Sequence, residues 1–316
     1  MPKFDFSAVG FLVLDVLCRG ADNMPPSGGA TFVDQIHMTV AGTAGGTAVD
    51  CALLGLDGQI VARVGKDDMG DFLISRMSRF GLDVRQVQRD QSLQTSTSML
   101  PISSRGDRRA FFVPGASRTF TLDPAQTEAA LDADIIHLGG TGLLDSFDGE
   151  PSLQFLKGAK ELGRTTVFDL ILADATTIEK VAPLLPFIDY FVPSIVEASA
   201  MAAMEDPADV ARWFKNQGVG NAILTLEDKG VYVDPQDGDA FICPAHRIDV
   251  IDTTGCGDSF TAGIIAGISR NWDIRRSARF ANAVAALVAG GLGSQGKLTS
   301  FDTALDAMES LPLNDH

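Results

Sequence analysis

The sequence predicts an α/β fold in which a mainly parallel β-sheet is covered by helices on both faces, forming three layers. The first observation is that short apolar, β-rich runs alternate with helical patterns through most of the chain, which is typical of such sheets. The second is composition: 45% of the 316 residues are hydrophobic and 21% are charged, as in ordinary globular proteins. We therefore expect one α/β domain over residues 1–316 with a small β lid.

The elements follow in a regular order. Strands are expected at 8–16, 60–64, 134–138, 166–170, 190–192 and 222–226, with helices between them at 46–56, 69–80, 152–162, 176–185 and 209–217. Asp15 interrupts the first of these strands. Burying a carboxylate in a strand is costly unless it is hydrogen-bonded or faces a cleft, so Asp15 is interpreted as a ligand contact in preference to a solvated turn residue. The last third of the chain predicts helices at 260–269, 274–289 and 303–309.

Two stretches, about 18–40 and 94–115, interrupt the alternation because they are rich in Gly, Pro, Ser and Thr. Short strand-like pieces at 95–100 and 109–113 suggest a small flap of strands that shields a reaction from water, with an ordinary surface hairpin as the alternative. Strands of this kind can pair across a two-fold axis. A homodimer formed through the lid is therefore one expectation, and a monomer is the alternative.

The formal net charge of −16 argues against nucleic acid or an anionic membrane surface as a partner, because both require clustered Lys and Arg. The N-terminal stretch is a poor signal peptide, no run of about 18 apolar residues lacks charge, and the four cysteines are scattered. We expect a cytoplasmic protein with reduced thiols.

The segment Asp252-Thr-Thr-Gly-Cys-Gly-Asp258 leads directly into a helical pattern. A helix start has unpaired N–H groups and partial positive charge, so it suits a phosphate where nothing bulky blocks the approach. Gly255 and Gly257 clear that approach, and Asp258 could take a proton from an alcohol beside the phosphate. A plain helix cap made by Asp252 or Thr254 is the alternative.

A second glycine motif, Gly291-Leu-Gly293-Ser-Gln-Gly296, satisfies the dinucleotide-binding pattern G-x-G-x-x-G. It follows a helical run instead of a strand, and Leu298 stands where a phosphate loop has its magnesium-binding hydroxyl. We therefore interpret these glycines as a helix end and an irregular loop.

These motifs together resemble the ribokinase or PfkB family of small-molecule kinases, over nearly the full chain. The segment 252–258, continued by Ser-Phe, is similar to one family signature. A second similarity covers Gly42-Thr-Ala-Gly45-Gly46-Thr-Ala-Val-Asp50 and the later run Ala62-Arg-Val-Gly-Lys-Asp-Asp-Met-Gly70. The resemblance implies a ribokinase-like fold, ATP and Mg²⁺ as cofactors, with K⁺ as an optional activator, and a small-molecule substrate.

The resemblance also implies roles for individual residues. Asp258 resembles the catalytic base, and the N–H groups of Gly255, Cys256 and Gly257 resemble the anion hole. Substrate contacts are implied for Asp15, Gly45, Gly46, Asp50, Arg109 and Phe111, the last two as lid residues. ATP contacts are implied for Ser194, Thr225, Glu227, Gly230, Thr254 and Asn282, Mg²⁺ binding through water for Glu197, and a monovalent cation for Asp252.

Three positions and one short stretch depart from the family pattern. Asp50 stands where Asn is usual, Ser194 replaces the Asn of the magnesium motif, and Glu227 replaces a Gly near the phosphates, where a carboxylate repels them unless it points outward or binds a cation. The Asp-Pro-Asn-x-Arg stretch of some sugar-acid and fructose kinases is reduced here to Asp169-Leu-Ile-Leu, which counts against those substrates.

The predicted function is therefore transfer of the γ-phosphoryl group of ATP to an alcohol group of a sugar. A phosphorylated substrate would need several cations, for which Arg63, Arg105, Arg108 and Arg109 are the nearby candidates. A nucleoside would need an aromatic wall, which Phe111 or Phe112 could provide, so a nucleoside (adenosine-like) kinase is the alternative within the class. A catalytically inactive sugar or nucleotide sensor, and an oxidoreductase that uses Gly291–Gly296, are the alternatives outside it.

Overall fold

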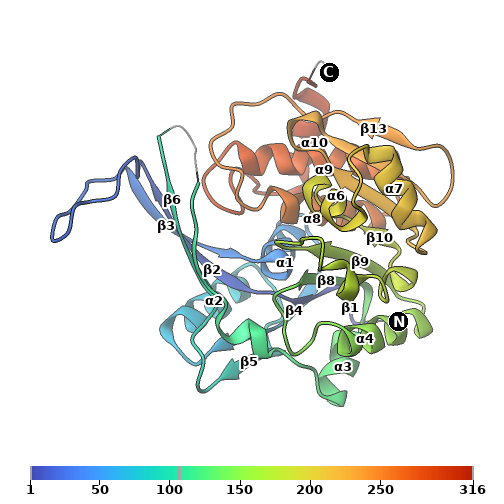
Figure 1. Ribbon diagram of the computed structural model, residues 1–316, viewed down its shortest axis with the longest axis horizontal. Helices are drawn as coiled ribbons and strands as arrows, with labels where there is room; N and C mark the ends of the chain where they lie inside the picture. The colour runs from blue at the N-terminus through green and yellow to red at the C-terminus, as the bar shows by residue number, and fades with distance from the viewer. Residues whose placement is uncertain (1, 105–107, 315–316) are drawn as a thin grey trace.

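The computed structural model describes residues 2–104 and 108–314, and its main feature is a nine-stranded sheet with the order β13-β12-β11-β10-β9-β8-β1-β4-β5 (Figure 1). The strands from β11 to β5 in this order run parallel, whereas β12 and β13 are antiparallel additions at one edge. The sheet consists of β1 (Phe4–Gly10), β4 (Gly58–Gly65), β5 (Val87–Asp90), β8 (Ala133–Thr141), β9 (Thr165–Leu170), β10 (Tyr190–Phe191), β11 (Asn221–Thr225), β12 (Val231–Asp234) and β13 (Phe241–Cys243).

Helices cover both faces of this sheet, as its strand sequences require. Successive side chains of a strand point to opposite faces, so Ile135 and Val167 join one apolar cluster while their neighbours Ile136 and Phe168 join the other. The first cluster takes in α1 (Thr43–Leu53), α2 (Asp68–Arg79), α8 (Cys256–Ser269), α9 (Ile274–Ala289) and α10 (Phe301–Ser310). The second takes in α3 (Pro124–Ala130), α4 (Glu150–Glu161), α5 (Ile178–Val181), α6 (Ile195–Ala202) and α7 (Pro207–Asn216). The predicted three-layer fold is confirmed.

A second, four-stranded sheet extends away from the body of the molecule (Figure 1). Its order is β3 (Gln35–Ala41), β2 (Val13–Arg19), β6 (Thr97–Ile102) and β7 (Phe111–Val113), so it draws on the two stretches in which a lid is predicted. We call it the small sheet. That it acts as a lid stays a prediction.

The expected strand 8–16 is wrong as a single element. The chain forms β1, turns at Gly10 with a φ of 127°, and continues as β2 in the small sheet. A side chain at Gly10 would lie 2.1 Å from the carbonyl oxygen of Gly139, so only glycine fits this turn. Asp15 therefore belongs to β2 of the small sheet and is not at the end of the first strand.

The helix expected at 176–185 is also shorter than predicted. It is reduced to α5, and a 3₁₀ turn at Leu185–Phe187 follows. Pro183 and Pro186 lie in this stretch, and a proline inside a helix removes a backbone donor and clashes with the preceding turn.

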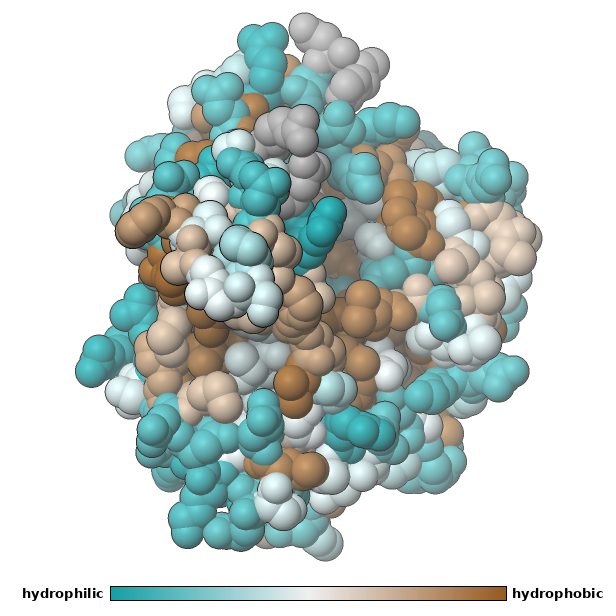
Figure 2. Space-filling model, turned by 60° about the vertical axis from the view of Figure 1, so that its left-hand side comes forward, coloured by the Kyte–Doolittle hydropathy of each residue, from teal (hydrophilic) through white to brown (hydrophobic). Residues whose placement is uncertain are grey.

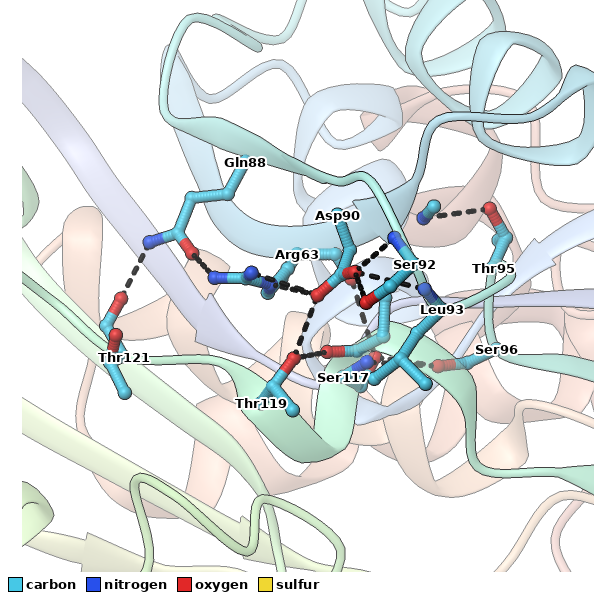
Figure 3. A network of polar contacts seen from close by, with 12 residues as sticks. Arg63, Gln88, Asp90, Ser92, Leu93, Thr95, Ser96, Ser117, Thr119 and Thr121 are labelled. Atoms are coloured by element: carbon cyan, nitrogen blue, oxygen red, sulfur yellow. Dashed lines mark hydrogen bonds and ion pairs between the residues drawn. The ribbon is translucent and has the colours of Figure 1, made fainter.

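A polar network joins the base of the small sheet to the large one (Figure 3). The guanidinium of Arg63 on β4 donates twice to Asp90 on β5, at 3.0 and 2.8 Å, and the same carboxylate accepts from Ser92 N and Leu93 N. These backbone donors, together with Arg63, hold the pKa of Asp90 well below its usual value. Next to it, the Ser96 hydroxyl donates to Ser117 at 2.8 Å. The network fixes the chain where it enters β6.

Candidate active site

The site is built around the start of α8. Gly255 is its N-cap residue and has a φ of 78°, and a side chain there would lie 2.7 Å from Cα of Ser294. The next two residues begin the helix, so their N–H groups are among those that a helix leaves without an internal partner. Cys256 N–H makes only a long bond of 3.3 Å to the Thr253 carbonyl oxygen. The segment predicted as an anion hole is therefore a helix N-terminus with a close backbone approach.

Two cavities meet at this helix start. The first, of about 380 Å³, opens between the small sheet and the strand ends, and the second, of about 760 Å³, lies toward α9. They share the lining residues Ser194, Thr225, Thr253, Cys256 and Gly257. We call them the lid-side cavity and the α9-side cavity. Two ligands bound in them would touch at the N-terminus of α8.

Asp258 lies in the first turn of α8, lines the lid-side cavity and is partly buried. Burial and the nearby carboxyl of Asp15 raise the pKa of Asp258 to about 7, while Arg108 opposes the rise. A carboxylate whose pKa lies near neutrality is suited to accept a proton from an alcohol. A side chain at Gly46 on α1 would lie 2.6 Å from Oδ2 of Asp258, so this glycine makes room for the carboxylate.

Asp15 also lines the lid-side cavity, from β2. Burial raises its pKa to about 6, and the Ser98 hydroxyl and Arg108 oppose the rise. In the strand register Asp15 pairs with Ser98 of β6, which also lines the cavity. The small sheet thus contributes polar groups from two neighbouring strands.

Asp50 and Gly45 lie beneath the cavity instead of lining it. A side chain at Gly45 would lie 2.6 Å from Leu12, so this glycine permits close packing of α1. Asp50 is fully buried, and burial, reinforced by Asp258 and opposed by Gln295, raises its pKa well above the usual value. A carboxyl that stays protonated is uncharged and can both donate and accept, as the amide of Asn can.

The sequence analysis predicts that Arg109 and Phe111 contact the substrate. In the structure, the residues next to them in the chain line the lid-side cavity instead. Arg108 and Phe112 line the lid-side cavity, whereas Phe111 is 53% exposed and Arg109 does not line it. Side chains of a strand alternate between two faces, so Phe111 lies on the other face of β7 from Phe112. Arg108 Nη1 donates to Thr254 Oγ1 at 2.7 Å, which brings a cation beside the predicted anion hole.

Ser194 and Glu197 form a capping box at the start of α6. The Ser194 hydroxyl accepts from Glu197 N–H at 3.2 Å and lies 2.7 Å from Glu197 Oε2, and both residues line the lid-side cavity. Ser and Asn are both good N-cap residues, so Ser194 preserves the local structure of the motif in which Asn is usual. Glu197 is therefore held at the cavity by a local helix cap.

The α9-side cavity holds most residues predicted to contact ATP. Thr225 ends β11, Glu227 and Gly230 belong to the turn after it, and Asn282 donates from α9 to the carbonyl oxygens of Cys243 and Pro244 at 3.1 and 3.0 Å. Glu227 is exposed and has a φ of 55°, a conformation that favours glycine. The backbone therefore explains why Gly is usual at this position.

Asp252 is buried and lies in the loop just before α8. Its Oδ1 accepts from Thr254 N and Oγ1 at 3.0 and 2.7 Å, and its Oδ2 accepts from Gly293 N at 2.9 Å. These bonds use most of the acceptor positions of a carboxylate. Asp252 therefore ties the loop before α8 to the loop after α9, and a monovalent cation there stays a prediction.

The loop Gly291–Gly296 follows α9, as the sequence analysis expects, and Ser294 brings it against Gly255. Sequence reasoning did not assign it to the site. It also did not assign Asp169, which is the penultimate residue of β9, lines the lid-side cavity and is 5% exposed. Burial, with Asp258 and Glu197 nearby, raises the pKa of Asp169 well above its usual value. The signal that could have identified Asp169 as a site residue was its position at the carboxyl end of a parallel strand.

The thiol at the start of α8 is poorly suited to nucleophilic chemistry. Burial and neighbouring carboxyls raise the pKa of the Cys256 thiol to about 12, so this cysteine is not an activated nucleophile. Among residues 2–104 and 108–314, no three carboxylate, imidazole or thiol groups converge to hold a metal ion, and no helix is long and apolar enough to cross a membrane.

Comparison with known proteins agrees with this arrangement. Residues 14–300 match the sequence model of the "pfkB family carbohydrate kinase". The chain is 26% identical over 295 residues to 2-dehydro-3-deoxygluconokinase of Bacillus subtilis, covering 88% of this chain and 90% of that protein. It is 22% identical over 284 residues to the ribokinase of Staphylococcus aureus, covering 86% and 89%. Among solved structures, Arabidopsis thaliana ribokinase complexed with ribose and ATP superposes with a TM-score of 0.82 at 21% identity, covering 98% of this chain and 99% of that one.

Proposed function

This chain belongs to the pfkB family of carbohydrate kinases, and on that premise we propose that it transfers the γ-phosphoryl group of ATP to a hydroxyl group of a sugar, with Asp258 as the general base. The observation that carries the proposal is the meeting of two cavities at the N-terminus of α8, beside a carboxyl with a pKa of about 7. ATP would occupy the α9-side cavity and the sugar the lid-side cavity.

The reaction needs mainly positioning and charge stabilisation. The acceptor hydroxyl attacks the γ-phosphorus in line, its proton passes to Asp258, and the bond between the γ-phosphorus and the β–γ bridging oxygen breaks. The N–H groups of Gly255, Cys256 and Gly257 stabilise charge on the transferred group, and Arg108 adds a cation from the small sheet. Asp15 would hold neighbouring sugar hydroxyls.

Mg²⁺ fits this site as an ion that arrives with the nucleotide. Magnesium typically binds through one or two carboxylates and substrate phosphates. Among the described residues, Glu197 is one of four carboxyl side chains that line the lid-side cavity, and it is hydrogen-bonded to Ser194, which lines both cavities. When bound, the ion would neutralise phosphate charge. In this proposal a water molecule bridges Glu197 and the magnesium ion. Asp252 remains the candidate for binding a monovalent cation.

A coupled ADP-release assay with pentoses, hexoses, sugar acids, sugar phosphates and nucleosides tests the proposal. We expect acceptor-dependent ADP release with at least one class. Thermal shifts with ATP–Mg²⁺ but no turnover on any acceptor would favour the inactive sensor. A thermal shift with NAD(P) but none with ATP–Mg²⁺ would favour the oxidoreductase.

A homodimer through the small sheet and a cytoplasmic location remain predictions. The small sheet exposes apolar side chains on β3 and β6, with Ile36 66% and Met99 52% exposed. Light scattering after size-exclusion chromatography, compared between the chain and an Ile36→Lys, Met99→Lys variant, tests the dimer: a monomeric mass for the unchanged chain would contradict it.

A further inference from the structure

The lid-side cavity has walls of opposite character. One wall carries the carboxyls of Asp15, Asp169 and Asp258, and Arg108 is the one Lys or Arg that lines the cavity among the residues that the structure describes. The other wall is apolar and comes from the residue after β1, the segment after β8, the end of β9 with the residue that follows it, and β7. In the face shown in Figure 2, hydrophobic side chains likewise gather around a hollow near the middle of the molecule.

Positive charge is scarce where an anionic acceptor would need it. Arg108 donates to Thr254 beside the anion hole, where it faces the arriving phosphoryl group. Arg63 is engaged with Asp90 at 2.8 Å in the network at the base of the small sheet (Figure 3), and Arg105 lies outside the described residues. A carboxylate or phosphate on the acceptor would therefore lie among carboxyls, without the convergent cations that such groups bind.

The apolar wall continues one of the two core clusters. Phe11 and Phe112 contact each other edge to face, with ring centroids 5.9 Å apart, and Leu143, Leu170 and Ile171 belong to the same cluster and also line the cavity. A free sugar has hydroxyls on most of its carbons, and this wall offers them no hydrogen-bond partner. A flat, largely apolar group would instead cover it.

Leu172 adds an independent observation at the same rim. It is 73% exposed, lines the cavity and has a φ of 54°, which is a strained conformation for leucine. It belongs to the segment Asp169–Leu172, in which apolar residues replace the polar stretch of some sugar-acid kinases. A ligand that packs on Leu172 would account for an exposed, strained leucine at the mouth of the cavity.

We propose that the acceptor is an uncharged nucleoside, with its sugar hydroxyls at Asp15 and Asp258 and its base against Phe112 and the 170–172 segment. This inference rests on the proposed phosphotransferase function. The chemistry is unchanged: a sugar hydroxyl oxygen forms the new bond to the γ-phosphorus, the bond to the β–γ bridging oxygen breaks, and the hydroxyl proton goes to Asp258.

The test compares initial rates with ATP–Mg²⁺ for uridine, adenosine, ribose, ribose 5-phosphate and gluconate. We expect kcat/KM for the better nucleoside to exceed that for ribose by about 10-fold, and those for gluconate and ribose 5-phosphate by about 100-fold. A ribose value equal to or above both nucleosides, or a best value for either anion, overturns the inference and leaves the kinase function intact. Absence of acceptor-dependent ADP release for all five overturns the inference, and the wider acceptor panel described above, which includes hexoses, then decides whether the kinase function fails as well.

Matched variants separate stacking from general damage. Phe112→Ala should raise KM for the nucleoside about 10-fold and leave KM for ribose unchanged, and Phe112→Leu serves if the alanine variant folds poorly. Val113→Ala, at an exposed side chain of the same strand that does not line the cavity, should change neither. Equal effects of Phe112→Ala on nucleoside and ribose would refute base stacking at this wall.

Discussion

Replacing Asp258 by Asn removes the proposed base and a buried charge together, so it should lower activity and raise stability. Asn has nearly the same shape but cannot accept the hydroxyl proton, and loss of a positioned base typically lowers kcat by about 10²–10⁴. We expect a fall of about 10³ with little change in ATP binding. Asp50 and Asp169, whose pKa values Asp258 also raises, should ionise more easily in the variant.

The stability change follows from the pKa of Asp258. A rise from 3.8 to about 7 means that the folded state binds more protons than the unfolded state between these pH values. Stability should therefore fall as pH increases through this window, and the full loss should be present above pH 7. The shift corresponds to about 4 kcal/mol, which we halve to about 2 kcal/mol because the side chain is partly exposed to solvent.

The assay compares Tm of the wild type and Asp258→Asn at pH 5 and pH 8. An increase of about 2 kcal/mol corresponds to about 4 °C for a chain of this size. We expect the variant to melt about 4 °C higher than the wild type at pH 8 and only about 1.5 °C higher at pH 5. The same Tm difference at both pH values, or a kcat within 10-fold of wild type, would refute the reasoning.

Four further predictions concern the same site. In the wild type, log(kcat/KM) should rise with unit slope up to about pH 7 and then level off, because Asp258 must be ionised to act as base; a flat profile from pH 5 to pH 8 would contradict this. Gly46→Ala should lower kcat about 10- to 100-fold with little loss of Tm, because the new methyl group would lie 2.6 Å from Asp258 Oδ2. Glu197→Gln should raise the Mg²⁺ concentration for half-maximal activity several-fold at fixed ATP. Arg108→Ala should lower kcat at least 10-fold, whereas Arg109→Ala should stay within about 3-fold of wild type; the reverse order would restore the original sequence prediction.

A matched control supports the glycine substitution. Gly158→Ala is also in a helix, where a new methyl group would meet only Leu131 at 3.4 Å, an ordinary contact. It should leave kcat unchanged and slightly raise Tm, because Ala favours a helix over Gly. A comparable loss of activity at both positions would mean that the clash with Asp258 is not the cause.

The sequence was sufficient for the layers of the fold and for the helix start after 252–258, because both depend on local patterns. Strand–helix alternation predicts the parallel sheet, and the glycines and carboxylate of 252–258 predict a helix start that can hold an anion. The error at 8–16 has a tertiary cause: Gly10 turns the chain because the Gly139 carbonyl leaves no room for a side chain. No pattern within residues 8–16 contains that contact.

The acceptor side was harder to predict because its residues come from strands that meet only in the folded chain. Arg108 and Phe112 differ from the predicted Arg109 and Phe111 by one residue, and one residue reverses the face of a strand. Asp169 lies far from the signature motifs in the sequence and joins the site through the sheet register. The departures at Asp50 and Glu227 become understandable only when burial and backbone conformation are known.

The most direct test of the central claim is detection of the phosphorylated product. Incubation with ATP–Mg²⁺ and the acceptor that gives the fastest ADP release, followed by ³¹P NMR, should show one phosphomonoester signal that grows in step with ADP and is absent with Asp258→Asn. ADP formed together with inorganic phosphate and no phosphomonoester, or equal product from Asp258→Asn, would contradict the account.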